Sequence, residues 1–112
     1  MKPETIVARI MALPEVVEAP HFEARSFRVG GKIFATMPPD DEHLHVLVDA
    51  DVARAAAGAD PVACEELWWG KQLAGVRVRM SAIHSSTLAP LLEAAWRRRA
   101  PKRLLAIRDG RP

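Results

Sequence analysis

Five cations lie within seven positions near the C-terminus of this 112-residue sequence: Arg97, Arg98, Arg99, Lys102 and Arg103. Such a density of Lys and Arg is typical of surfaces that neutralise the phosphates of nucleic acids. Contacts of this kind position a protein on the backbone without reading the base sequence. The pattern predicts a weak, sequence-nonspecific DNA interface, with Arg97, Arg98, Lys102 and Arg103 as its contacts.

The end of a helix explains part of the same cluster. Arg97 follows Glu93 by four residues, a spacing at which a helical ion pair is worth only about 0.2–0.5 kcal/mol. Cations in the last turn of a helix are also stabilised by its dipole, by roughly 0.3–1 kcal/mol. This accounts for the three consecutive arginines without a ligand, but less readily for Lys102 and Arg103.

A second basic set occupies a predicted strand and the turn before it. Arg77 and Arg79 alternate with apolar residues, and Lys71 precedes them. If these cations share an uncovered sheet face, Trp68 or Trp69 can stack on a base. The alternative is a solvated basic face with both tryptophans mostly in the core. We include Lys71, Arg77 and Arg79 as candidate phosphate contacts.

Two histidines follow three acidic residues, since Asp40, Asp41 and Glu42 precede His43 and His45. Imidazole and carboxylate groups together can bind a divalent metal. His43 and His45 share one face of a predicted strand, but no third ligand stands at a fixed spacing. An exposed strand after an acidic turn explains the pattern more simply, so we predict no metal site.

Nucleophilic catalysis has little support in the sequence. Cys64 is followed by two glutamates, which would raise rather than lower the pKa of a thiol. Ser85 and Ser86 follow His84, but neighbours in sequence do not make a catalytic triad, and helix capping accounts for the serines. We predict that the chain is not an enzyme and needs no cofactor.

The composition indicates one domain with an uneven charge distribution. Residues 1–80 hold nine Lys or Arg against twelve Asp or Glu, whereas residues 81–112 hold seven against two. An acidic body with a basic C-terminal part is compatible with a polyanionic partner. We find no apolar run of the roughly 18 residues that a membrane span needs and no signal peptide. With a single cysteine, the chain is expected to be cytoplasmic.

Hydrophobic periodicity and turn residues predict an α+β fold. Apolar spacing predicts a first helix ending at Pro14 and a last helix limited by Pro101. Between them we expect an antiparallel sheet, covered on one face by these N- and C-terminal helices. The predicted elements are helices at 3–13, 51–57 and 87–100, strands at 25–29, 32–37, 43–49, 66–69 and 76–80, and a polar connection or short edge strand at 15–21.

Several local details follow from the same patterns. Gly30 and Gly31 form the loop of a hairpin that places Phe27 opposite Phe34. Thr87 or a neighbouring serine caps the last helix, with Pro90 in its first turn. Residues 1–105 form the single domain, and residues 106–112 form a basic C-terminal tail that we expect to be mobile, within a terminal arm at 102–112.

Three runs of residues resemble the MmcQ/YjbR family of small bacterial domains, over about residues 5–105. They are Met11-Ala-Leu-Pro-Glu-Val-Val-Glu18, Ser26-Phe-Arg-Val-Gly-Gly-Lys-Ile-Phe-Ala35 and Leu91-Leu-Glu-Ala-Ala-Trp-Arg-Arg-Arg-Ala-Pro-Lys-Arg-Leu104. The resemblance implies a frataxin-like (CyaY-like) fold with terminal helices on an antiparallel sheet. It also implies DNA binding through a proposed double-wing arrangement.

The resemblance is incomplete before the penultimate strand. Many members carry His, Asn, Lys and Trp there, whereas this chain keeps Lys71 and lacks the later Trp in Trp68-Trp-Gly-Lys-Gln-Leu-Ala-Gly75. A frataxin-like fold also suggests iron binding, which depends there on an acidic first helix and the neighbouring strand. The first helix of this chain has Glu4 against Lys2 and Arg9, which disfavours iron binding. The main hypothesis is therefore DNA binding, and the alternative is a protein-interaction or small-ligand module on the open sheet face.

Overall fold

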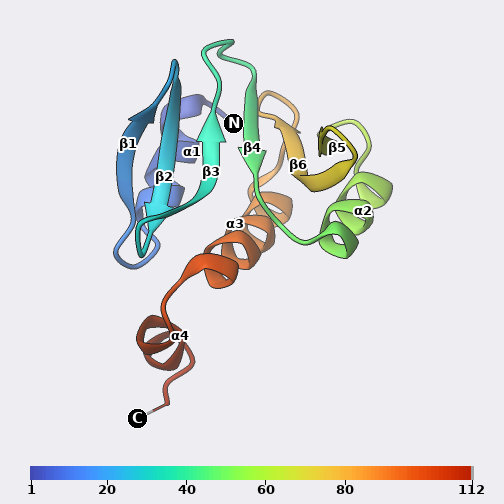
Figure 1. Ribbon diagram of the computed structural model, residues 1–112. Coiled ribbons are helices and arrows are strands. Elements are labelled where there is room, and N and C mark those ends of the chain that lie inside the picture. Colours follow the sequence, from blue (N-terminus) through green and yellow to red (C-terminus); the bar gives the residue numbers. More distant parts are fainter. Residues whose placement is uncertain (112) are drawn as a thin grey trace.

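A six-stranded antiparallel sheet forms the centre of the computed structural model, which describes residues 1–111. The strand order is β1-β2-β3-β4-β6-β5, so β1 and β5 are the two edges (Figure 1). This α+β arrangement confirms the predicted fold class. The elements are α1 (Pro3–Met11), β1 (Val17–His21), β2 (Ala24–Val29), β3 (Lys32–Met37), β4 (His43–Val46), α2 (Ala50–Ala59), β5 (Cys64–Trp69), β6 (Gln72–Arg79), α3 (Ser85–Arg99) and α4 (Lys102–Arg108).

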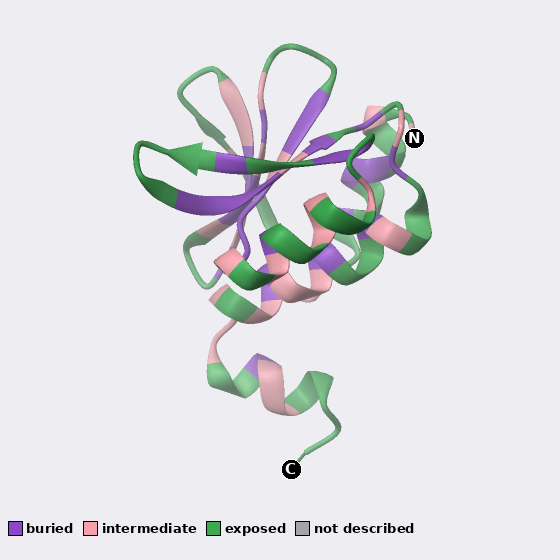
Figure 2. Cartoon of the chain, turned by 90° about the vertical axis from the view of Figure 1, so that its right-hand side faces the viewer, coloured by how far each residue is buried: buried purple, intermediate pink, exposed green. Residues whose placement is uncertain are grey.

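The hydrophobic core lies between the sheet and the helices α1 and α3. Ile6 and Ile10 of α1 and Leu88 and Trp96 of α3 are fully buried, as the helical spacing predicts. They pack with apolar residues of the strands in one continuous cluster. Figure 2 shows these buried segments on the facing sides of the helices and the sheet. The Nε1 of Trp96 donates a hydrogen bond to the carbonyl oxygen of Pro14, 3.0 Å away, which joins α3 to the end of α1.

The β2–β3 hairpin forms at Gly30 and Gly31, and both residues have positive φ angles. Glycine adopts this conformation without steric cost, which explains the tight loop. The expected pairing of Phe27 with Phe34 is wrong. A β-bulge shifts the register so that Phe27 faces Ala35, and the carbonyl of Phe34 accepts a hydrogen bond from Leu47 N–H.

The C-terminal region differs from the expectation in two ways. Helix α3 begins at Ser85, two residues before the expected Thr87, and it has no side-chain cap; Pro90 therefore lies inside the helix rather than in its first turn. The expected arm after Pro101 is instead helix α4, which runs across the expected boundary at residue 105. Proline without an N–H is well suited to the start of a helix, so Pro101 separates two helices rather than ending the ordered chain.

None of the helices in the described residues is long and apolar enough to cross a membrane.

Candidate nucleic-acid interface

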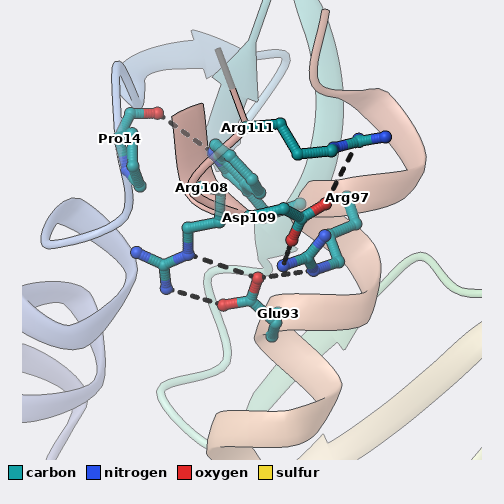
Figure 3. Close-up of polar contacts among 7 residues, drawn as sticks. Pro14, Glu93, Arg97, Arg108, Asp109 and Arg111 are labelled. Atoms are coloured by element: carbon teal, nitrogen blue, oxygen red, sulfur yellow. Dashed lines mark hydrogen bonds and ion pairs between the residues drawn. The ribbon is translucent and has the colours of Figure 1, made fainter. Parts of the chain in front are cut away.

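Helix α4 is attached to α3 by ion pairs that converge on Glu93 (Figure 3). Glu93 accepts hydrogen bonds from Arg97 Nε at 2.8 Å and from Arg108 Nη2 at 2.7 Å. Arg97 also donates to Asp109 at 2.7 Å, and the guanidinium of Arg108 lies over the ring of Trp96. The hydrogen bond from Arg108 lowers the pKa of Glu93. Arg97 is thus part of a structural network.

Two more of the predicted phosphate contacts have carboxylate partners. Arg98 donates to Asp49, at the start of α2, over 2.9 Å. Arg103 makes a two-pronged contact with Glu15, over 2.8 and 2.7 Å, and this hydrogen bonding lowers the pKa of Glu15. Both pairs are solvent-exposed, so each contributes little to stability. They reduce the positive field of the cluster without fixing its arginines permanently.

The β2–β3 loop packs against the link between α3 and α4. A Cβ placed on Gly30 would lie 3.1 Å from the ring of Pro101. Five cations lie within two residues of Gly30 or Pro101 in the sequence. Arg28 donates to the Oγ of Ser26 and Arg103 pairs with Glu15, whereas the other three have no side-chain hydrogen bond and no carboxylate within 4.0 Å among residues 1–111. These junction cations are Lys32, Arg99 and Lys102. Only Lys102 was among the predicted contacts, because nothing in the sequence indicates that residue 30 meets residue 101.

Arg99 differs from its neighbours in its surroundings. Its side chain is half-buried, and its buried Nε has no hydrogen-bond partner in the described part of the chain. A buried N–H donor without an acceptor is costly, and such groups usually bind ordered water or a ligand. The junction therefore holds a net positive charge and an unsatisfied donor, both of which suit an anionic oxygen.

The second basic set lies elsewhere on the molecule. Figure 1 places α4 and β5 at opposite corners, and α3 packs on β3 and β4. Lys71 lies exposed in the β5–β6 turn, and Arg79 of β6 lies opposite His43 of the neighbouring strand β4. Arg77 lies 3.6 Å from Glu65 and 4.0 Å from Asp40, so its charge is largely offset. The structure does not join the two sets into one patch.

The group formed by Asp40, Glu42 and His43 has ligand atoms within 4.8 Å of one another. It has a structural explanation, however. Asp40 accepts hydrogen bonds from the N–H groups of Glu42 and His43 and contacts the Nδ1 of His43 at 2.6 Å. Burial acts to raise the pKa of Asp40, but these hydrogen bonds outweigh it and lower the pKa to about 2. The nearby guanidinium of Arg77 further disfavours a metal cation.

The strand after this turn is less exposed than expected. His43 is buried, and the Nε2 of His45 is buried without a hydrogen-bond partner within residues 1–111. Burial is the main cause that lowers the pKa of His45, and the positive charge of Arg77 lowers it further. A polar cavity of about 50 Å³ lies beside His43 and Glu65. It has room for a few waters but is much smaller than the roughly 300–1,000 Å³ of small-molecule pockets.

Cys64 is buried as well. Burial raises the pKa of its thiol, so the thiol is protonated at neutral pH and has little nucleophilic character. Ser85 and Ser86 are exposed in the first turn of α3. The expectation that the chain is not an enzyme remains a prediction.

Comparisons with known proteins identify relatives of the chain by sequence and by structure. The model of the YjbR family matches residues 11–98. The crystal structure of the Deinococcus radiodurans protein DR2400, which carries the DUF419 domain, resembles the fold with a TM-score of 0.74. Their sequence identity is 18%, and the similarity covers 99% of this chain and 89% of that one. Among curated proteins none matches the sequence.

Proposed function

The chain belongs to the YjbR family, and we propose that it binds nucleic acid weakly and without sequence preference, through phosphate contacts at the junction of the β2–β3 loop with the α3–α4 link. The contact between Gly30 and Pro101 supports this proposal most directly, because it brings together the two chain segments that carry the three junction cations. Phosphate contacts need clustered cations rather than a defined pocket.

Charge balance distinguishes this region from the rest of the basic surface. Lys32, Arg99 and Lys102 have no carboxylate partner in the described residues, whereas Arg98 and Arg103 each have one. Because exposed ion pairs are weak, Arg98 and Arg103 can exchange their carboxylates for phosphate oxygens at a small cost. These two arginines would then add phosphate contacts to those made by the junction cations. Arg97 is a less suitable contact because it bonds to both Glu93 and Asp109.

Lys71, Arg77 and Arg79 would form a separate and weaker contact. Arg77 is close to two carboxylates, and Glu65 and Glu66 lie on the adjacent strand β5. These acidic groups repel phosphates near Trp68 and Trp69, which makes base stacking on the two tryptophans unfavourable. The junction is therefore the first place to test.

The test is fluorescence anisotropy with labelled duplex and single-stranded DNA over a range of salt concentrations. Three phosphate contacts predict a slope of log K against log salt of about −3 on duplex DNA. The variant with Lys32→Glu and Lys102→Glu should lose at least about tenfold in affinity, because two attractive charges become repulsive. Arg54→Glu is a matched control, since Arg54 is exposed on α2 and has no carboxylate partner within residues 1–111.

The outcomes are distinguishable. Salt-independent binding, absence of binding at low salt, or wild-type affinity of the junction variant would each refute the junction site. Loss of binding on Lys71→Glu with Arg79→Glu, while the junction variant still binds, would move the contact to the second basic set.

A further inference from the structure

The strand β5 is an edge of the sheet, with no strand on its outer side among residues 1–111. It pairs only with β6, and from Glu65 to Trp69 no backbone hydrogen bond joins it to any other element within residues 1–111. The outward N–H and C=O groups of an edge strand form a template on which another extended chain can add.

The two edges of this sheet differ in their protection. Strand β1, at the opposite edge, contains Pro20, which lacks an N–H and so blocks the addition of a strand. Strand β5 contains neither proline nor lysine between Cys64 and Trp69. Proteins commonly use these residues to prevent edge pairing. Charged side chains and bulges also protect an edge. Strand β5 carries Glu65 and Glu66 and a register shift after Leu67, so it is open to a partner whose charges complement these carboxylates.

One face of β5 carries a carboxylate beside an exposed indole. Successive side chains of a strand alternate between faces, so Glu66 and Trp68 share one face, and Trp68 Nε1 donates to Glu66 at 3.2 Å. Glu65 and Trp69 lie on the other face, about 13 Å apart along the strand, so each can contact a different side chain of a partner. Trp68 is 48% exposed and Trp69 is 56% exposed, which is unusual for tryptophan.

This pairing of groups suits a cationic side chain. A guanidinium or ammonium group can lie on an indole ring and bond to a carboxylate at the same time. We propose that β5 binds an extended basic peptide by strand addition, with Arg or Lys side chains directed to Glu66 and Trp68 on one face and to Glu65 and Trp69 on the other. Main-chain hydrogen bonds supply affinity in this mode, and the alternate side chains supply specificity.

The charges argue against two other occupants. A second copy of the chain paired through β5 in the register that places Glu65 opposite Glu66 would set like charges against each other, which is destabilising. A nucleic acid would meet the same carboxylates with its phosphates. Glu65 is 3.6 Å from Arg77, but Glu66 has no cation within 4.0 Å among the described residues, so Glu66 is the stronger anchor.

The experiment uses a short, end-blocked peptide rich in Arg and Thr, titrated into the full chain. Tryptophan fluorescence reports binding, and hydrogen exchange reports protection of the backbone at 65–69. Glu66→Gln and Trp69→Ala should each weaken binding roughly two- to fivefold. Glu23→Gln and Phe22→Ala are matched controls, because both residues are exposed near the opposite edge of the sheet. Thermal unfolding verifies that each variant is folded.

Two control peptides separate strand addition from simple charge attraction. A peptide with alternate backbone nitrogens methylated keeps its charge but loses hydrogen-bond donors, so it should bind much more weakly. A peptide with Glu in place of Arg should not bind. Equal binding of the methylated peptide, no protection at 65–69, or no effect of Glu66→Gln and Trp69→Ala would overturn the proposal. So would self-association of the chain through β5.

This surface is independent of the junction. The variant with Lys32→Glu and Lys102→Glu should bind the basic peptide as the wild type does, and a loss of peptide binding there would contradict the proposed location.

Discussion

Gly75 of β6 lies directly against the carbonyl group of Val46, where β4 ends. A Cβ on Gly75 would overlap that oxygen and approach the Cα of Leu47 to 3.0 Å. Both obstacles are backbone atoms, which cannot rotate away as a side chain can. The position therefore requires glycine because of space rather than because of its φ angle.

Gly75→Ala should destabilise the fold severely. Overpacking a core position usually costs about 1–3 kcal/mol, and a clash with backbone should reach or exceed the upper value. Chemical denaturation measures the free energy of unfolding. Gly58→Ala is the matched control, because Gly58 lies in α2 with nothing within 4 Å of an added Cβ. That change should be neutral or stabilise the protein by up to about 1 kcal/mol. Equal stability of the two variants would contradict the packing described for Gly75.

Trp96→Phe should lower the free energy of unfolding by about 2–4 kcal/mol. The substitution leaves a cavity at a fully buried position and removes the donor for the carbonyl of Pro14. Trp69→Phe, at an exposed position, should change stability by less than about 0.5 kcal/mol. Equilibrium unfolding followed by far-UV circular dichroism compares the two, and a cost for Trp96→Phe no larger than the control would be inconsistent with its burial.

Glu93→Gln should loosen α4 while leaving the rest of the protein unchanged. The substitution weakens the contacts to Arg97 and Arg108, and such exposed ion pairs contribute little to the overall stability of a protein. Buried Leu104 still holds part of α4 in place. Hydrogen exchange should therefore speed up in residues 102–108, with little change in Tm. Glu23→Gln serves as the control, and unchanged exchange in α4 would show that the network does not hold the helix.

The stability of the protein should fall in two steps as the pH decreases. Burial lowers the pKa of His45 below 6.5, so its stabilising contribution is complete above pH 6.5 and declines below it. The hydrogen bonds from Arg108 and Arg103 lower the pKa values of Glu93 and Glu15 below 4.5, and the pKa of Asp40 is lowered to about 2. These carboxylates share a stabilising contribution that is complete above pH 4.5 and is lost in more acidic solution. Thermal unfolding across this range measures both steps. His45→Gln should remove the upper one, and stability that rises on acidification would contradict both assignments.

Local patterns in the sequence predicted the fold well where short-range physics decides it. The helical spacing of Ile6 and Ile10 placed α1, and Gly30-Gly31 placed the hairpin loop. The pairing of Phe27 with Phe34 is wrong because a β-bulge between Phe27 and Arg28 shifts the register, and the alternation of apolar residues does not indicate a bulge. Helix α4 is not predicted because Pro101 indicates the end of the last helix, whereas a proline can also stand at the start of the next one.

The candidate site was predicted only in part, for a similar reason. The density of cations was visible in the sequence, but their partners were not. Arg103 and Glu15 are separated by 88 residues, and Arg98 and Asp49 by 49. Only the folded chain shows which cations are neutralised by such pairs and that Lys32 belongs with Lys102.

The ion pairs that attach α4 make its position sensitive to ionic strength. Dissolved salt screens exposed charges over a Debye length of about 8–10 Å at moderate concentration. It would therefore weaken the links from Arg103 to Glu15 and from Arg108 to Glu93, while the apolar core is little affected. The same ions compete for phosphate contacts at the junction. Detachment of α4 would also release Arg103, so this protein can gain a free cation under the conditions that weaken its hold on a polyanion.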